Sequence, residues 1–263
     1  MSYDTIPKIV KRGVGMKELD FLKDVLVRAY DRFCSDEVLV SDKAAFDVVT
    51  NVDKGIELFF AEEVKKEFPD DLLLGEEFTS EQEVQGRTWI LDPIDGTYNF
   101  SIGSRLFGLQ AALMEEGEVL CSVIYLPKFG EIYEASVGEG AFCNGVRLNV
   151  SERVAEKSIV SFGDLPHARP NDAMEQGRMM QRAYTAIARL RMYGAACLDF
   201  ANLASGKTEG VVLFTRNKWD LAPGLLLAKE AGATLLDPDG KPYSFEARGI
   251  FACNRKELYH ALN

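Results

Sequence analysis

Residues 89–97 read Trp89-Ile90-Leu91-Asp92-Pro93-Ile94-Asp95-Gly96-Thr97, a short apolar run that passes into two carboxylates and a hydroxyl. The apolar run predicts a buried strand. Asp92 precedes a proline, which pushes its backbone towards extended geometry, and Gly96 permits a conformation that a side chain would disfavour. We therefore expect a tight loop at the end of the strand, with Asp92, Asp95 and Thr97 facing one pocket.

Two carboxylates this close repel each other unless a cation lies between them. Mg²⁺ suits such a site because it prefers oxygen ligands. Further acidic residues stand at the ends of two other predicted elements, at Glu76-Glu77 and at Asp220. Taken singly, these would be a solvated turn and a helix cap. Taken with Asp92 and Asp95, they predict a two-metal site that hydrolyses a phosphate ester, with Thr97 orienting the water.

The composition limits the function classes that remain. The chain has 263 residues, of which 47% are hydrophobic, so it can bury one large core or two packed domains. A formal net charge of −11 disfavours a nucleic-acid partner, and two histidines leave little for histidine-based zinc chemistry. No apolar run is long enough to cross a bilayer, so no membrane partner is expected. Five dispersed cysteines and the lack of a signal peptide predict a cytoplasmic protein with reduced thiols.

The first part of the chain predicts helices followed by an antiparallel sheet. Apolar residues have helical spacing over residues 16–34. From 107 to 148, apolar runs alternate with turn residues, and Asn144-Gly145 predicts a hairpin. Residues 1–148 are therefore expected to form an α+β half that carries the metal-binding loop Asp92–Thr97.

The second part of the chain has a different pattern. Beyond residue 150, predicted strands alternate with helices, among them a helix over 172–190 followed by a strand at 192–193. Such alternation is typical of an α/β arrangement. We expect residues 149–263 to form an α/β half, packed on the first half without a flexible linker.

Three motifs in this order resemble the signature of a known family. They are Gly75-Glu76-Glu77, the run Trp89–Thr97 and Trp219-Asp220-Leu221-Ala222-Pro223-Gly224, and the segments Asp47–Asp53 and Gly194–Ala196 add to the similarity. The resemblance is to the inositol monophosphatase family of Mg²⁺-dependent, lithium-sensitive phosphatases. It implies a layered α/β/α/β/α sandwich, a homodimer and a small phosphorylated metabolite as substrate.

The resemblance also implies two or three bound Mg²⁺ ions and the residues that hold them. Glu76, Asp92 and the backbone carbonyl of Ile94 would hold the ion that activates the water. Asp92, Asp95 and Asp220 would hold a second ion beside the leaving oxygen, and Glu76 would help to bind a weaker third ion.

Other residues of the same resemblance would position the water and the substrate. Thr97, supported by Asp47, would position the nucleophilic water. The backbone amides of Gly96 and Thr97 would hold the phosphate. The segment Gly194-Ala195-Ala196 would contact the rest of the substrate.

The sequence departs from the family pattern where the leaving group of the substrate would lie. Inositol-specific members carry an acidic residue seven positions before the aspartate that corresponds to Asp220, whereas this chain has Leu213. Arg191, Arg216 and Lys218 are close by in the sequence. They are either surface residues or contacts for a second anionic group of the substrate.

These departures leave the substrate open. The favoured function is Mg²⁺-dependent hydrolysis of a small sugar or polyol phosphate monoester such as inositol monophosphate. The alternatives within the family are fructose 1,6-bisphosphate, NADP and 3′-phosphoadenosine 5′-phosphate, and a remote alternative is a catalytically silent binding subunit. An aspartyl-phosphate phosphatase is disfavoured, because its nucleophile loop needs aspartates two positions apart, whereas Asp92 and Asp95 are three apart.

Overall fold

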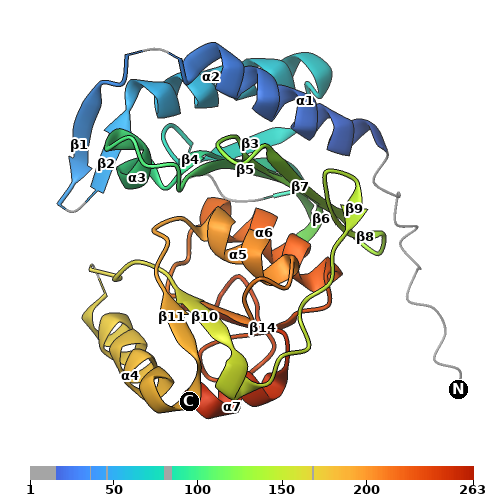
Figure 1. The fold of residues 1–263 in the computed structure, drawn as a ribbon. Coiled ribbons are helices and arrows are strands. Elements are labelled where there is room, and N and C mark those ends of the chain that lie inside the picture. Colours follow the sequence, from blue (N-terminus) through green and yellow to red (C-terminus); the bar gives the residue numbers. More distant parts are fainter. Residues whose placement is uncertain (1–15, 36, 46, 80–84, 168) are drawn as a thin grey trace, which may run out of the picture.

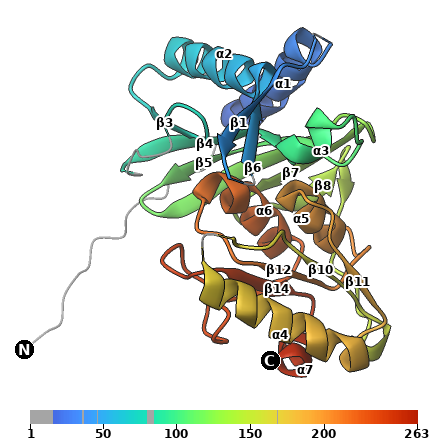
Figure 2. The same ribbon diagram turned by 90° about the vertical axis from the view of Figure 1, so that its left-hand side faces the viewer.

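Five layers of helices and sheets are stacked in the computed structural model, which describes residues 16–35, 37–45, 47–79, 85–167 and 169–263. Helices α1 (Met16–Phe33) and α2 (Asn51–Glu67) cover one face of a seven-stranded sheet (Figure 1). Helices α5 (Ala196–Ala204) and α6 (Lys218–Glu230) lie between that sheet and a five-stranded sheet. Helices α4 (Pro170–Ala186) and α7 (Lys256–Leu262) cover the far side (Figure 2). This order confirms the expected α/β/α/β/α sandwich.

The seven-stranded sheet has the strand order β3-β4-β5-β6-β7-β8-β9. Strands β3 and β4 are parallel, and the other neighbouring pairs are antiparallel, as expected for residues 107–148. The predicted hairpin at Asn144-Gly145 joins β8 to β9, and these residues have φ values of 48° and 78°. The strands are β3 (Leu72–Gly75), β4 (Arg87–Asp95), β5 (Gly108–Glu115), β6 (Glu118–Leu126), β7 (Glu131–Ser136), β8 (Gly140–Cys143) and β9 (Val146–Arg147).

The five-stranded sheet has the order β11-β10-β12-β14-β13 and corrects one sequence prediction. The helix predicted over 172–190 ends at Ala186, and the strand predicted at 192–193 lies at residues 189–191. Parallel pairing of Leu190 with Val160 outweighs the helical spacing in this segment. The strands are β10 (Ile159–Phe162), β11 (Arg189–Arg191), β12 (Gly210–Leu213), β13 (Thr234–Leu236) and β14 (Ile250–Cys253), and a short helix η1 (Ala155–Lys157) precedes them.

A two-stranded hairpin stands at the edge of the first layer. It consists of β1 (Val40–Ala44) and β2 (Asp47–Thr50), runs beside α3 (Thr97–Ser101) and leads directly into α2 (Figure 1). A capping box starts α2: the Thr50 hydroxyl accepts from the amides of Val52 and Asp53, and the Asp53 carboxylate accepts from the Thr50 amide at 2.9 Å. The hairpin is thereby tied to the first turn of α2.

The two predicted halves share a core. Helix α6 comes from the second half, yet it packs against β4, β5 and β6 of the first sheet. The expected division into 1–148 and 149–263 therefore stays a prediction. Among the described residues, no helix has the length and apolar character needed to cross a bilayer. The prediction that a signal peptide is lacking concerns residues 1–15, which lie outside the described residues.

The packing of α5 on α6 offers a test of the shared core. A Cβ at Gly224 would overlap the Phe200 ring, so Gly224→Ala should lower the free energy of unfolding by about 1–3 kcal/mol, as overpacking usually does. Urea unfolding followed by circular dichroism measures this change. The matched control is Gly177→Ala in α4, where a Cβ would meet no atom within 4 Å and the helix propensity of Ala should be neutral or stabilising. Equal destabilisation of both variants would contradict the packing argument.

Candidate active site

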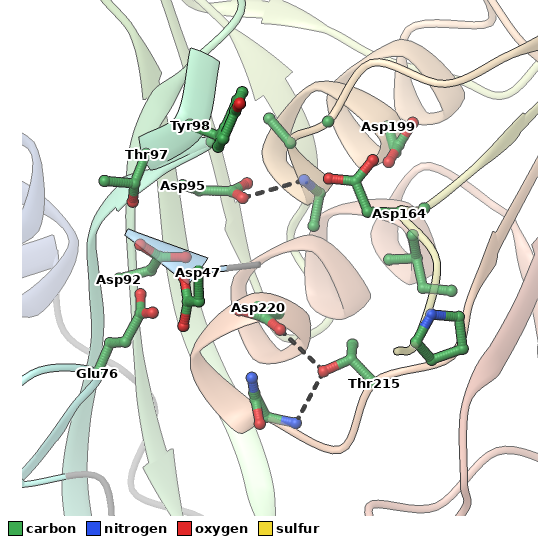
Figure 3. A pocket seen from close by; sticks show the side chains of 18 of the residues that line it. Asp47, Glu76, Asp92, Asp95, Thr97, Tyr98, Asp164, Asp199, Thr215 and Asp220 are labelled. Atoms are coloured by element: carbon green, nitrogen blue, oxygen red, sulfur yellow. Dashed lines mark hydrogen bonds between the residues drawn. The ribbon is translucent and has the colours of Figure 1, made fainter. Parts of the chain in front are cut away.

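Strand β4 continues through the two carboxylates and does not end before them. Asp92 pairs with Gln110 and Asp95 with Gly108, so β4 has two residues where β5 has one, which is a β-bulge. The expectation of a separate loop is therefore wrong, because pairing with β5 continues as far as Asp95. The bulge lets both carboxylates, three positions apart, reach one cavity (Figure 3).

Two other segments bring further carboxylates to the bulge. Strand β3 runs parallel to β4 and ends at the same edge of the sheet, so Glu76 follows it close to Asp92. Asp220 lies in the first turn of α6, where the Thr215 hydroxyl donates a 2.8 Å hydrogen bond to its Oδ2. Glu76, Asp92 and Asp220 therefore surround the same space, as Figure 3 shows.

The cavity has a volume of about 340 Å³ and collects most of the residues that the sequence predicted for the site. Arg191 and Arg216 are exposed and do not line it, so the substrate contacts predicted for them stay predictions. Asp164, Asp199 and Thr215 line it as well, although no sequence motif marked them. The predicted residues that line it are Asp47, Glu76, Asp92, Ile94, Asp95, Gly96, Thr97, Gly194, Ala195, Ala196 and Asp220.

Burial and mutual repulsion make the carboxylates of the cavity hard to ionise. The side chain of Asp92 is 1% exposed, and burial, followed by the charges of Glu76 and Asp95, raises its pKa well above the usual range. Burial and the charge of Asp220 raise the pKa of Glu76 to about 8. Burial and the charge of Asp95 raise the pKa of Asp220 to about 7. Among the described residues, the positive charge beside Glu76, Asp92, Asp95 and Asp220 is too small to keep all four ionised together.

The N-terminus of α5 holds Asp95. The amide of Ala196 donates to its Oδ1 at 3.1 Å, and the amide of Cys197 donates to its Oδ2. Burial raises the pKa of Asp95, and these hydrogen bonds at the positive end of a helix partly offset the effect. The carboxylate thus faces the segment that the sequence assigned to the substrate.

Gly96 is required at the close approach between the end of β4 and that segment. Its φ is 89°, and a Cβ would lie 2.9 Å from the Cβ of Ala195 and 3.0 Å from the carbonyl oxygen of Leu106. Asn99 of α3 holds the start of the segment Gly194–Ala196 in place, because its Nδ2 donates to the carbonyl of the preceding residue, Tyr193, at 2.8 Å. The need for glycine that the sequence predicted is therefore confirmed.

The Thr97 hydroxyl lies between two acceptors. Its Oγ1 is 2.8 Å from the carbonyl oxygen of Ile94 and 3.2 Å from Oδ1 of Asp53. Burial raises the pKa of Asp53 to about 6, and its hydrogen bonds with Thr50 and Thr97 work against this rise. Asp47 lines the same cavity, and the support that it was predicted to give Thr97 stays a prediction.

The donor set of the cavity fits a hard divalent cation. It consists of oxygen atoms, and the buried Oδ1 of Asp92 has no hydrogen-bond partner among the described residues, which is costly unless a cation binds there. In the part of the chain that the structure describes, no three acidic, His or Cys side chains are gathered closely enough to hold a metal ion, so binding one would have to draw the carboxylates of the cavity together. Lys43 supplies some counter-charge, with Nζ 2.9 Å from Glu76 and 2.8 Å from Glu77. The atoms that could hold Mg²⁺ belong to Glu76, Asp92, Ile94, Asp95 and Asp220.

Known proteins share both this sequence and this fold. The sequence profile of the Inositol monophosphatase family matches residues 22–263. The fructose-1,6-bisphosphatase/inositol-1-monophosphatase of Thermotoga maritima is 36% identical over 204 residues, which cover 77% of this chain and 76% of that protein. The Nus factor SuhB of Haemophilus influenzae is 33% identical over 245 residues, 91% of this chain and 90% of that protein.

A solved structure extends the likeness to the fold. The IMPase/NADP phosphatase complexed with Mg²⁺ and phosphate superposes with a TM-score of 0.77 at 26% identity, over 94% of this chain and 94% of that chain. Its layered architecture therefore agrees with the one described above. On the profile match and the identity to curated members, the chain belongs to the inositol monophosphatase family.

Proposed function

We propose that this protein is a Mg²⁺-dependent phosphatase that hydrolyses a small sugar or polyol phosphate monoester, such as inositol monophosphate, by two-metal activation of water. The observation that carries the proposal is the convergence of Asp92, Asp95 and Asp220 on a cavity that also contains the Thr97 hydroxyl. Family membership supports the reaction class. The substrate, the metal ions and the roles of single residues are the proposed part, as are the homodimer and the sensitivity to lithium.

Two sets of ligands would hold the metal ions, and Asp92 belongs to both. Glu76, Asp92 and the carbonyl of Ile94 would hold one ion, and Asp92, Asp95 and Asp220 would hold the other. When bound, Mg²⁺ lowers the pKa of a coordinated water and stabilises negative charge on the phosphate and the leaving oxygen. A cation at this shared position would give the buried, unpaired Oδ1 of Asp92 a partner.

The Thr97 hydroxyl would orient the attacking water. Its proton is donated to Asp53 or to the Ile94 carbonyl, so its lone pairs remain free to accept a hydrogen bond from a water in the cavity. Asp47 lines the cavity and would accept a second hydrogen bond from that water. The two acceptors together would aim a lone pair of the water at the phosphorus atom.

The charge of the cavity favours a substrate with a single phosphate. Arg169, the one basic side chain among the described residues that line it, has its guanidinium bonded to two backbone carbonyls. The amides of Gly96 and Thr97 would bind the phosphate beside the metal ions. A second phosphate on the substrate would then face Asp164 and Asp199. The acidic lining residues are Asp47, Glu76, Asp92, Asp95, Asp164, Asp199 and Asp220.

The remainder of the substrate would lie against the segment Gly194–Ala196 and Leu213, which line the same cavity. These residues offer backbone groups and an apolar wall. They suit a compact alcohol better than a nucleotide base or a second phosphate ester. This arrangement supports the monoester over fructose 1,6-bisphosphate, NADP or 3′-phosphoadenosine 5′-phosphate.

A silent binding subunit is the alternative outside catalysis. One relative is named a Nus factor, and a role of that kind would not need an intact hydrolytic site. The complete set of carboxylates in the cavity and the net charge of −11 favour the enzyme over a nucleic-acid-binding role. Release of phosphate by the wild type that Asp95→Asn abolishes would exclude the silent subunit.

A panel of phosphate esters at one fixed Mg²⁺ concentration tests the substrate class. We expect kcat/KM for inositol 1-phosphate or another polyol monophosphate to exceed that for the three alternative substrates by at least about tenfold, because a second phosphate beside uncompensated carboxylates is repelled. Released phosphate is measured by a colorimetric assay. A higher kcat/KM for fructose 1,6-bisphosphate would contradict the monoester proposal and leave the phosphatase class intact.

Removing one charge from the ligand set tests the metal site. Asp92→Asn and Asp220→Asn keep the size of the side chain, so we expect both variants to fold. We expect their kcat/KM to fall at least about 100-fold, a larger loss than is usual when a residue that only supports a metal ligand is replaced. Circular dichroism and phosphate release give the two readouts. Asp70→Asn, at an exposed position before β3, is the matched control and should keep full activity. Unchanged activity of Asp92→Asn at saturating Mg²⁺ would contradict the site.

Removing the metal should make stability depend on pH. Glu76 and Asp220 have pKa values of about 8 and about 7 in the folded protein, whereas unfolded carboxyl groups titrate near about 4. The folded state then binds more protons than the unfolded state, so the free energy of unfolding should rise as the pH falls from about 8 to about 5. Thermal unfolding in EDTA measures this trend.

Saturating Mg²⁺ is the control for the pH experiment. A bound cation keeps the carboxylates ionised, so the increase in unfolding temperature on acidification should vanish or reverse. Asp220→Asn in EDTA should show a shallower pH dependence than the wild type. If the metal-free wild type became steadily less stable as the pH fell from about 8 to about 5, the assignment of buried, uncompensated carboxylate charge would be contradicted.

A further inference from the structure

We propose that Thr215 is the positioning residue that makes Asp220 available to a metal ion. Its hydroxyl takes the hydrogen bond of the Asn217 amide, which would otherwise hold the Asp220 carboxylate against the start of its own helix. The inference rests on the proposed function, since Asp220 is taken as a metal ligand. Thr215 stands two positions after β12 and outside the sequence motifs that marked the site.

Two aspartates of this protein occupy the same position at the start of a helix. Asp53 is the third residue of α2 and Asp220 is the third residue of α6, so each could reach back to the amide of the residue before its helix. Asp53 does so, because its Oδ2 accepts from the amide of Thr50 at 2.9 Å and completes a capping box. An aspartate held in this way is used by its own helix.

At the start of α6, a hydroxyl lies between the amide and the carboxylate. The Asn217 amide donates to Oγ1 of Thr215 at 3.2 Å, and the same hydroxyl donates to Oδ2 of Asp220 at 2.8 Å (Figure 3). The side chain of Asn217 makes no cap hydrogen bond. Thr215 thus pairs the Asn217 amide in place of Asp220, and the carboxylate lines the cavity.

These hydrogen bonds limit what Thr215 can do. Thr215 lines the cavity, yet its one proton goes to Asp220, so it has none left to donate to a substrate. Donation to Oδ2 favours the ionised carboxylate and fixes its rotation, so that Oδ1 is the oxygen left for a cation. Lys43 beside Glu76 brings a positive charge that would repel a metal ion, whereas the hydroxyl of Thr215 brings none.

The segment that carries Thr215 is itself held by the five-stranded sheet and the chain around it. The Arg169 guanidinium donates to the carbonyl of Phe214, the residue directly before Thr215. On the same segment, the backbone passes so close to Gly249 that a Cβ there would meet the carbonyl oxygen of Leu213. The position of the Thr215 hydroxyl is therefore set by its surroundings, and the Asp220 carboxylate is oriented toward it.

Thr215→Val tests the inference, because it removes the hydroxyl and nearly keeps the shape of the side chain. Without the hydroxyl, Asp220 can turn to the Asn217 amide, as Asp53 turns to Thr50 in α2. We expect the Mg²⁺ dissociation constant, measured by calorimetry without substrate, to rise about tenfold, or about 1.4 kcal/mol. Thr215→Ala should give the same pattern. Thr215→Ser keeps the hydroxyl and should stay within about twofold of the wild type.

Thermal unfolding in EDTA separates positioning from a role in stability. The Asn217 amide gains another acceptor in Thr215→Val, so the metal-free unfolding temperature should stay within about 2 °C of the wild type. A purely structural role would lower this temperature and leave the Mg²⁺ dissociation constant unchanged. Thr185→Val, at an exposed position of α4, is the matched control and should change neither quantity.

The double variant with Asp220→Asn shows whether Thr215 acts through the carboxylate. If it does, adding Thr215→Val to Asp220→Asn should change the Mg²⁺ dissociation constant by less than about twofold, because the ligand is already impaired. A tenfold loss in both backgrounds, or unchanged Mg²⁺ affinity in both Thr215→Val and Thr215→Ala, would overturn the inference.

Asp220→Asn alone keeps this inference apart from the proposed function. If Asp220→Asn weakens Mg²⁺ binding and Thr215→Val does not, the inference fails and the metal site stands. If Asp220→Asn leaves Mg²⁺ binding unchanged, the proposed metal site fails, and the inference fails with it.

Discussion

Mutual repulsion among buried carboxylates is the interaction that the rest of the site must manage. Two unit charges 4 Å apart repel by about 4 kcal/mol at the effective dielectric of a protein surface, a large share of the stability of a typical domain. Contacts with the rest of the protein offset part of this repulsion. The N-terminus of α5 binds Asp95 and Lys43 binds Glu76, whereas burial, followed by the charges of Glu76 and Asp95, raises the pKa of Asp92 well above the usual range. These contacts together do not neutralise the negative charge that the ionised carboxylates would carry.

The layered fold brings these charges together from distant parts of the chain. The parallel pair β3 and β4 places Glu76 near Asp92, and the bulge in β4 adds Asp95. Helix α6, which follows β12 in the chain and lies between the two sheets (Figure 1), contributes Asp220 from its first turn. Because α6 packs on the first sheet, the site exists only when both sheets are in place. This dependence ties the integrity of the shared core to the chemistry of the cavity.

The sequence predicted the chemistry of the site better than its geometry, for physical reasons. Carboxylates beside a proline and a glycine identify oxygen ligands and a special backbone whatever the surrounding fold, and Gly96 has the positive φ expected. The bulge depends on pairing with β5, and the strand at residues 189–191 depends on β10, so neither is encoded locally. Asp53 is an ordinary helix-capping residue by its sequence. Its contact with Thr97 needs a residue 44 positions further along the chain, at the start of α3.

The same repulsion explains why the buried carboxylate of Glu57 on α2 is useful. Where the carboxylates ionise in the absence of metal, the like charges of Asp92 and Asp220 would push the loop of Glu76 outward. A loop free to retreat would have to be drawn back each time a cation bound, and that ordering would weaken metal affinity. Glu57 opposes the retreat through backbone amides, which carry no net charge and so add nothing to the repulsion. On this view the hydrogen bonds from Glu57 to the loop matter most before a metal binds, and the cations would then offset the carboxylate charge that a phosphate dianion would otherwise meet.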